Sequence, residues 1–127
     1  MTILGLGVDI VETTRIATAI ERHGEAFLRR IFTAGEIAYC SAMRDPMPFY
    51  AARFAAKEAV SKALGTGLGG DLAFSEIDIQ RRESGEPFVV LSGAGAATAA
   101  RLGVCEIRIS LSHTEHYAVA NALAVGP

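Results

Sequence analysis

The order of apolar and polar positions in the first half of the chain predicts one strand followed by helices. Residues 3–11 form a short apolar run rich in β-branched side chains, which is typical of a buried strand. Polar capping residues followed by amphipathic stretches predict helices over residues 13–22 and 34–43, the first interrupted by Gly24. A longer helix is predicted for residues 49–64, after a break made by two prolines.

The second half of the chain predicts strands around one helix. Residues 74–80 and 88–91 are joined by a turn sequence and indicate a hairpin. An alanine-rich helix is expected at residues 92–102, followed by strands at residues 104–111 and 117–125. Alanine occupies every second position of the last strand and Val or Leu most of the others, so both of its faces are expected to be covered. The pattern as a whole predicts an α+β fold in one domain, residues 1–127.

The long helix carries an unusual set of charges. Alanine and valine cover most of its surface, yet it also contains Arg53, Lys57, Glu58 and Lys62. Glu58 and Lys62 lie one turn apart and project side by side. They are either an ordinary stabilising ion pair, contributing about 0.2–0.5 kcal/mol, or a carboxylate and an ammonium that hold a metal and a phosphate.

Asp9 and His113 are two further candidates for a functional site. Asp9 is the only charge in the first apolar run, where a carboxylate is costly unless it is paired or bound to a cation. It can cap a helix, pair with an arginine such as Arg15, or bind a metal. His113 lies between Ser112 and Thr114 in an expected turn, which suits either phosphate oxygens or solvent.

The glycines at residues 65–70 match the letters G-x-G-x-x-G of a dinucleotide-binding fingerprint. That fingerprint follows a strand and opens a helix, whereas these glycines follow a helix. They therefore indicate a helix C-cap and a turn. No Lys-Ser or Lys-Thr follows them, so they do not form a phosphate-binding P-loop either.

Composition and charge narrow the classes of function. Half of the 127 residues are hydrophobic, more than a lone monomer of this size readily buries, so we expect a homo-oligomer. The net charge of −2 gives no reason to expect nucleic acid. Residues 15–62 nevertheless carry eight Lys or Arg against five Asp or Glu, a locally basic region that suits an acidic partner.

The cysteines and the apolar stretches of the sequence bear on where in the cell the protein is found. Cys40 and Cys105 have no metal-binding or C-x-x-C spacing, so free thiols are expected. The sequence shows no signal-peptide pattern and no apolar stretch long enough to span a membrane. These features predict a cytoplasmic protein.

Two segments together carry a resemblance to a known family. Gly-Leu-Gly-Val-Asp-Ile-Val at residues 5–11 and Arg-Phe-Ala-Ala-Lys-Glu-Ala at residues 53–59, continued by Lys-Ala-Leu-Gly-Thr-Gly at residues 62–67, resemble the two signatures of the 4′-phosphopantetheinyl transferases. Gly-Glu-Pro at residues 85–87 and Ser-His-Thr at residues 112–114 make the chain similar to the short bacterial class, the holo-[acyl-carrier-protein] synthases. The resemblance covers nearly the whole chain.

This resemblance implies a fold and an activity. The fold would be a small antiparallel sheet with a long central helix. The activity would be Mg²⁺-dependent transfer of phosphopantetheine from coenzyme A to a serine of an acyl carrier protein, which releases adenosine 3′,5′-bisphosphate and serves fatty acid biosynthesis. Mg²⁺ prefers oxygen ligands and keeps several waters, so two carboxylates, pyrophosphate oxygens and water suffice.

The resemblance also implies roles for residues. Asp9 and Glu58 would hold Mg²⁺, Lys62 would neutralise a phosphate oxygen on the leaving side, and Glu58 or a metal-bound water beside it would take the serine proton. The residues implied at coenzyme A are Arg53 and His113 at the nucleotide phosphates, with Ser61, Lys62, Gly65, Gly67 and Thr114 nearby.

The short class is implied to be a homotrimer with sites between subunits, which agrees with the apolar composition and the alanine-faced last strand. Arg15 and Arg22 would receive the acidic helix of the carrier protein. Longer members carry a second acid two residues after the aspartate, where this chain has Val11. Water would complete the metal shell here.

Two alternatives remain open at this point. One is another Mg²⁺-dependent nucleotide phosphotransferase or hydrolase that uses the same acids. The other is a trimeric module that binds coenzyme A or a carrier protein without catalysis.

Overall fold

The computed structural model describes all 127 residues and shows an α+β fold, as predicted. Its helices are α1 (Thr13–Ile31), α2 (Ala34–Ser41), α3 (Met47–Leu64) and α4 (Gly93–Arg101). Its strands are β1 (Thr2–Glu12), β2 (Ile77–Arg81), β3 (Pro87–Leu91), β4 (Glu106–His113) and β5 (Tyr117–Gly126). A short 3-10 turn, Phe74–Glu76, precedes β2.

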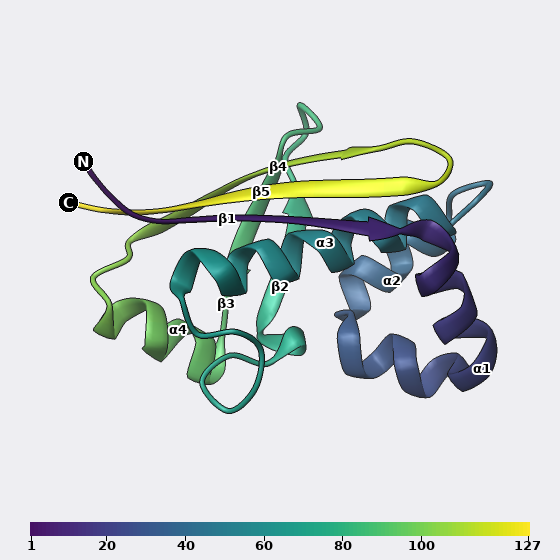
Figure 1. Cartoon of the computed structure of the whole chain (residues 1–127), viewed down its shortest axis with the longest axis horizontal. Coiled ribbons are helices and arrows are strands. Elements are labelled where there is room, and N and C mark those ends of the chain that lie inside the picture. The colour runs from purple at the N-terminus through teal and green to yellow at the C-terminus, as the bar shows by residue number, and fades with distance from the viewer.

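The strands form two antiparallel sheets. The larger has the order β1-β5-β4, and the smaller is the predicted β2-β3 hairpin. Asp9 of β1 lies opposite Ala120 of β5, which in turn lies opposite Leu111 of β4. In Figure 1, β1 and β5 run side by side over α3, with both termini at one end of the molecule and α1 and α2 at the other. This layering places Asp9 over α3.

The backbone of α3 packs directly on β1 because β1 has glycines where the two meet. A Cβ added to Gly7 would clash with the carbonyl oxygen of Ala59, and one added to Gly5 would clash with that of Ala63. Two residues of a strand rise about 6.7 Å, and one turn of a helix rises about 5.4 Å. Because these lengths are similar, alternate residues of β1 lie next to successive turns of α3. Asp9 is the next residue on this face of β1, and it therefore lies beside the helix.

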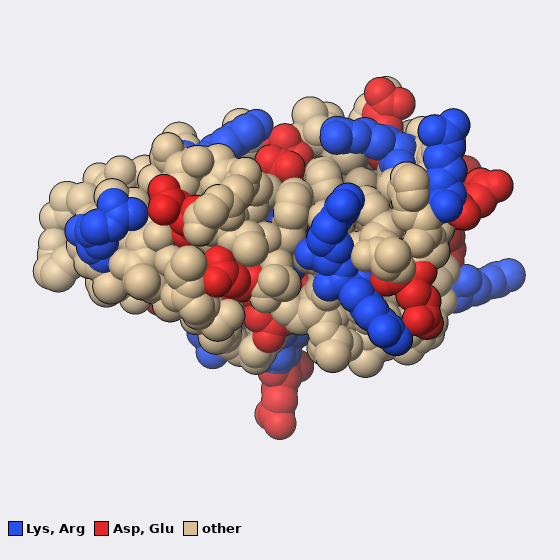
Figure 2. Space-filling view, turned by 90° about the horizontal axis from the view of Figure 1, so that it is seen from below, with Lys and Arg blue, Asp and Glu red and all other residues tan.

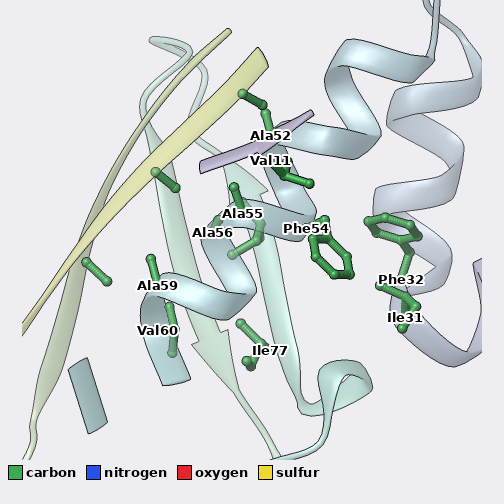
Figure 3. Close-up of a cluster of buried hydrophobic side chains, with 14 of the residues drawn as sticks. Val11, Ile31, Phe32, Ala52, Phe54, Ala55, Ala56, Ala59, Val60 and Ile77 are labelled. Atoms are coloured by element: carbon green, nitrogen blue, oxygen red, sulfur yellow. The ribbon is translucent and has the colours of Figure 1, made fainter. Parts of the chain in front are cut away.

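The alanine face of β5 packs against this same helix. Its alanines are 0–1% exposed, and the alanines of α3 are 0–6% exposed. Figure 3 shows this buried cluster. Small side chains lie between α3 and the larger sheet, and the larger side chains of Phe54 and Phe32 lie toward α1 and α2. The alanine face is thus covered within one chain, and the expectation that it contributes to a subunit interface is wrong.

The predicted burial of β1 holds for one face only. Leu6, Val8 and Ile10 point away from α3 and are 72%, 54% and 65% exposed, and Ile3 is 64% exposed. The prediction of a buried strand is therefore confirmed for the side with the glycines, and within one chain it is wrong for the other side. An exposed apolar row of this kind marks an interaction surface.

Several boundaries differ from the prediction for identifiable reasons. Gly24 adopts φ 58° and ψ −138°, a non-helical conformation that interrupts α1 as predicted, and a second helical segment, which was not predicted, continues α1 to Ile31. Proline is tolerated in a first helical turn, so α3 begins earlier than predicted, at Met47. His113 is the last residue of β4 rather than part of a turn. Gly65 caps α3 in the left-handed region, at φ 74°, as the glycine pattern predicted.

The capping box at Thr33 and Glu36 is confirmed, with both of its hydrogen bonds present. No helix combines the length and the apolar character that crossing a membrane requires.

Gly7→Ala tests the close approach of α3 to β1. The added methyl group has no free space, so we expect a loss of about 2 kcal/mol or more in the free energy of unfolding. Gly35→Ala is the matched control, because Gly35 lies in α2 with open space around it and no positive φ. It should be neutral or stabilising by up to about 1 kcal/mol. Thermal melting at one protein concentration measures both, and equal melting temperatures would contradict the packing.

Candidate functional site

The first group of functional side chains is defined here as the acid corner: Asp9 of β1, Arg15 of α1, and Glu58 and Lys62 of α3. Asp9 faces α3 because it shares its side of the strand with Gly5 and Gly7. Arg15 reaches the corner over the ring of Phe54, 5.6 Å from the ring centroid. Three elements thus bring two carboxylates and two cations together.

Lys62 pairs with Asp9 across the contact of helix and strand. Its Nζ donates to Asp9 Oδ1 at 3.2 Å and to the carbonyl oxygen of Val8 at 2.9 Å. The Asp9 side chain is 19% exposed and that of Lys62 is 52% exposed. Two interpretations from the sequence are therefore corrected: Lys62 makes no ion pair with Glu58 one turn away, and the ion-pair partner of Asp9 is Lys62 rather than Arg15.

Glu58 is left half-buried without an ion-pair partner. Its burial raises the pKa of the carboxyl above its usual range, the Asp9 carboxylate raises it further, and Lys62 and Arg15 act in the opposite direction. A cation placed between the two acids would relieve this repulsion. No further His, Cys, Asp or Glu joins them to make a group of three ligands. Two carboxylates completed by water and substrate oxygens are an arrangement that fits Mg²⁺.

The second group is defined here as the arginine pocket. It is a cavity of about 360 Å³ between α2, α3, β2 and the end of β4. Its side chains are those of Tyr39, Phe49, Ala52, Arg53, Arg81, Leu111, Ser112 and His113. The carbon of the Arg53 guanidinium lies 4.2 Å from the centroid of the Tyr39 ring, and that of Arg81 lies 5.5 Å from the same centroid. The His113 ring packs on Phe49 with 4.9 Å between centroids.

Arg53 is the most informative residue of this pocket. It is 2% exposed, no carboxylate pairs with it, and its Nε has no hydrogen-bond partner. A buried guanidinium without a counter-charge is costly. With a second guanidinium and an imidazole beside it, the pocket suits an anion with several acceptor oxygens, such as a phosphate.

The other residues expected at the site lie around these two groups. Ser61 is buried, and its hydroxyl donates to the carbonyl oxygen of Glu58 at 2.7 Å, so it is part of the helix rather than of an open surface. Gly65 and Gly67 have positive φ values in the turn after α3, with open space beside them. Thr114 closes the β4–β5 turn through its contacts with Tyr117. Arg22 is exposed on α1.

One chain does not bring the acid corner and the arginine pocket together. Arg53 and Glu58 are five residues apart on α3, which places them about 140° apart around its axis. None of the acid-corner residues lines the pocket. Within a protomer these are two separate half-sites.

Arg81, Tyr39 and Phe49 are pocket residues that sequence reasoning missed. Arg81 stands in a polar stretch before a turn, and the two aromatic residues fit amphipathic helices. Only the folded hairpin places the end of β2 next to α2 and α3. The only available signal was Arg53, because an arginine on an alanine-rich helix needs a partner.

Known proteins resemble this chain over nearly its whole length. The profile of the 4′-phosphopantetheinyl transferase superfamily matches residues 5–122. A holo-[acyl-carrier-protein] synthase of Koribacter versatilis is 46% identical over 121 residues, covering 95% of this chain and 97% of the relative.

Solved structures agree as well. The crystal structure of holo-[acyl-carrier-protein] synthase from Neisseria meningitidis matches with a TM-score of 0.91 at 34% identity, covering 98% of this chain and 99% of the other. The Helicobacter pylori enzyme in complex with coenzyme A matches with a TM-score of 0.85 at 31% identity, covering 94% and 99%.

The chain therefore belongs to the 4′-phosphopantetheinyl transferase superfamily. Within it, relatives that match over nearly their full length make the chain an enzyme of the holo-[acyl-carrier-protein] synthase class.

Glu58→Gln should stabilise the fold at neutral pH. Because the folded-state pKa of Glu58 is raised, the folded protein binds more protons than the unfolded chain between the ordinary value of 4.5 and the raised one, and stability falls as pH rises through that window. Glutamine does not titrate, so the variant should melt above the wild type at neutral pH and lose this advantage toward acidic pH. Glu83→Gln, at an exposed position, should change neither curve. A lower melting temperature for Glu58→Gln at neutral pH would contradict the origin given for the pKa shift.

Proposed function

We propose that the enzyme transfers the 4′-phosphopantetheine group from coenzyme A to a serine of apo-acyl carrier protein and releases adenosine 3′,5′-bisphosphate. The observation that carries this proposal is the complementary shortage of charge in the two half-sites. In the acid corner Glu58 has no ion-pair partner beside the Asp9–Lys62 pair, and the arginine pocket has a buried cation that lacks an anion. A nucleotide with a metal on its pyrophosphate would supply both. The coenzyme A in the Helicobacter pylori structure supports this choice of substrate.

In the acid corner, Asp9 and Glu58 would hold Mg²⁺. The ion would supply neutralisation of the charge that develops on the pyrophosphate as its phosphoanhydride bond breaks. Lys62, which already lies against Asp9, would neutralise a phosphate oxygen on the leaving side. Glu58, or a metal-bound water beside it, would accept the proton of the carrier serine.

In the arginine pocket, Arg53 and His113 would bind nucleotide phosphates, with Arg81 as a further cation. Tyr39 holds both guanidinium groups by cation–π contacts, which keeps them extended toward the cavity before a ligand arrives. Thr114 and the Gly65–Gly67 turn would contact the rest of coenzyme A. Ser61 would support this end of α3 through its bond to Glu58.

The working form is proposed to be a homotrimer whose active sites lie between subunits. Two observations support this. The exposed row Leu6, Val8 and Ile10 gives each chain an apolar face to cover, and one chain holds the half-sites on different sides of α3. A second chain docked on β1 would bring its arginine pocket to the acid corner of the first.

Arg15 and Arg22 on α1 are proposed to receive an acidic carrier protein. Figure 2 shows Lys and Arg side chains more frequent toward the end that carries α1 and α2, with Asp and Glu side chains among them. Their contribution would be capture and orientation of the carrier more than chemistry. Arg15 also reaches the acid corner, so a carrier bound there would present its serine to Glu58.

We place the reaction in the cytoplasm and in fatty acid biosynthesis. The free thiols support a reducing compartment. Cys40 is buried, and its burial raises the pKa of the thiol to about 11, so it takes no part in chemistry at neutral pH.

The direct test is intact-mass analysis of apo-acyl carrier protein incubated with the enzyme, coenzyme A and Mg²⁺. One phosphopantetheine adduct on the carrier is expected, and Asp9→Asn should remove most of it while leaving the oligomer intact. A carrier without the adduct, or hydrolysis of coenzyme A without carrier, would contradict the proposed transfer.

Arg53→Met tests the arginine pocket. Loss of a buried charge-assisted contact of about 1.5–3 kcal/mol predicts a rise of about tenfold or more in KM for coenzyme A, with KM for the carrier nearly unchanged. Arg101→Met, on the exposed end of α4, is the control and should alter neither constant. An unchanged KM for coenzyme A in Arg53→Met would refute phosphate binding in this pocket.

A further inference from the structure

Lys57 is a charged residue that the proposed reaction does not use. It immediately precedes Glu58 on α3, yet its side chain is 0% exposed, and so is that of its partner Glu36. A lysine at such depth is costly unless every proton of its ammonium group is bound. The burial of Lys57 therefore needs a structural or functional explanation.

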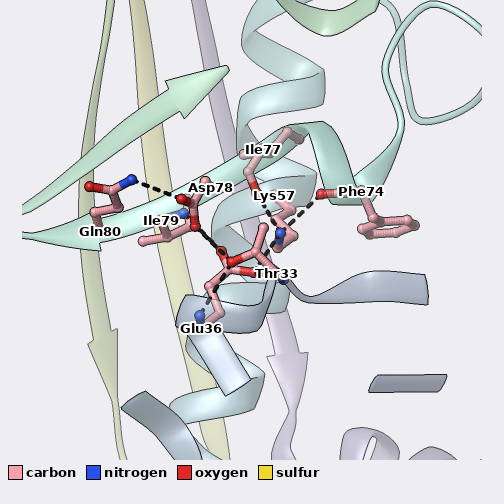
Figure 4. Close-up of polar contacts among 8 residues, drawn as sticks. All are labelled: Thr33, Glu36, Lys57, Phe74, Ile77, Asp78, Ile79 and Gln80. Carbon is pink, nitrogen blue, oxygen red and sulfur yellow. Dashed lines mark hydrogen bonds and ion pairs between the residues drawn. The ribbon is translucent and has the colours of Figure 1, made fainter. Parts of the chain in front are cut away.

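Its contacts tie α3 to two other elements. Lys57 Nζ pairs with Glu36 Oε1 at 2.8 Å and donates to the carbonyl oxygen of Phe74 at 2.9 Å and to that of Ile77. All three ammonium protons therefore have an acceptor. Figure 4 shows the ammonium between α2 and the start of β2.

Glu36 extends the same network. Its Oε1 also accepts from the backbone N–H of Thr33, and its Oε2 accepts from that of Ile79, both at 2.8 Å. The hydroxyl of Thr33 donates to Asp78. A single buried carboxylate thus joins α2, α3 and β2.

The network and the glycines of β1 hold α3 from different sides. On one side, Gly5 and Gly7 set the distance between helix and strand. On another, the Lys57 ammonium has to reach one carboxylate and two carbonyl oxygens at hydrogen-bond distance. Apolar side chains tolerate a small rotation of a helix, whereas three directional bonds to fixed acceptors do not.

The rotation of α3 decides where the catalytic side chains point. Glu58 is about 100° further around the axis than Lys57, and Lys62 is about 140° further. A rotation of about 20° would move side-chain tips, about 6 Å from the axis, by about 2 Å. A misplacement of about 1 Å at a reacting group can cost about a hundredfold in rate.

We propose that Lys57 and Glu36 are positioning residues, which fix the rotation of α3 so that Glu58 and Lys62 meet Asp9. This inference rests on the proposed function of the acid corner. Stability alone does not require the pair, because a buried ion pair can often be replaced by apolar residues at no cost in stability. Its value lies in the single orientation that it imposes.

The test compares Lys57→Met, the double variant Glu36→Gln/Lys57→Met, and Ile107→Ala. The double variant removes both charges together, so no unpaired charge stays buried. Ile107→Ala is the matched control, because it empties a core position that pairs with Ala124, whereas Asp9 pairs with Ala120 further along β5. Three quantities are measured: the melting temperature, the turnover number, and the affinity for Mn²⁺ in the presence of coenzyme A by electron paramagnetic resonance.

The double variant should melt above Lys57→Met and still lose about tenfold in turnover number and in Mn²⁺ affinity, with KM for the carrier unchanged. Ile107→Ala should lose stability but keep its Mn²⁺ affinity and turnover number. Wild-type Mn²⁺ affinity in the double variant, or equal losses in Ile107→Ala, would overturn the positioning role. If the double variant does not fold, Glu36→Gln is measured for the same Mn²⁺ affinity and turnover number, with the Lys57 ammonium still held by the carbonyl oxygens of Phe74 and Ile77.

Failure of the proposed function would look different. In that case the wild-type enzyme leaves the carrier unmodified, while the Mn²⁺ titrations still report whether Lys57 orients the two acids.

Discussion

The rest of the structure depends on how closely the backbone of α3 approaches β1. Two glycines remove the side chains that would keep helix and strand apart, and alanines on α3 and β5 fill the narrow space that remains. Because the approach is so close, Asp9 can lie on a strand and Lys62 on a helix and still form an ion pair at 3.2 Å. The buried Lys57–Glu36 pair on another side of α3 leaves the helix little freedom to turn. The close packing of small residues thus fixes the positions of the charged residues.

The charged side chains of the candidate site are divided between the acid corner and the arginine pocket. The acid corner holds Glu58, whose pKa is raised by its burial and further by the Asp9 carboxylate, and the arginine pocket holds a buried guanidinium without a counter-ion. A nucleotide with a bound metal ion would complete both half-sites. The metal would bind in the acid corner, and the nucleotide phosphates would bind in the arginine pocket. Unfavourable electrostatics in the free protein would be relieved on binding substrate, as is common where catalytic groups gather. Neither half-site alone indicates phosphopantetheine transfer, and the proposal that links them follows from membership of the superfamily.

The sequence predicted local features well and three-dimensional neighbours poorly. The elements, the Thr33–Glu36 capping box and the Gly65 cap follow from short-range periodicity and backbone preference, and the structure confirms them. Asp9 and Glu58 stood out because a charge among apolar residues needs an explanation. Arg81 could not be identified, since its role depends on where the hairpin packs. The sequence also did not show which face of β1 stays exposed within one chain. An apolar run has the same pattern whether its own chain or another chain covers it.

The most direct measurement is a crystal structure of the enzyme with coenzyme A and Mn²⁺, using the anomalous signal of the metal. One Mn²⁺ is expected between the carboxylates of Asp9 and Glu58 of one chain, with the nucleotide phosphates against Arg53 and His113 of a neighbouring chain. An Mn²⁺ peak away from the two carboxylates, or nucleotide phosphates outside the arginine pocket, would contradict it.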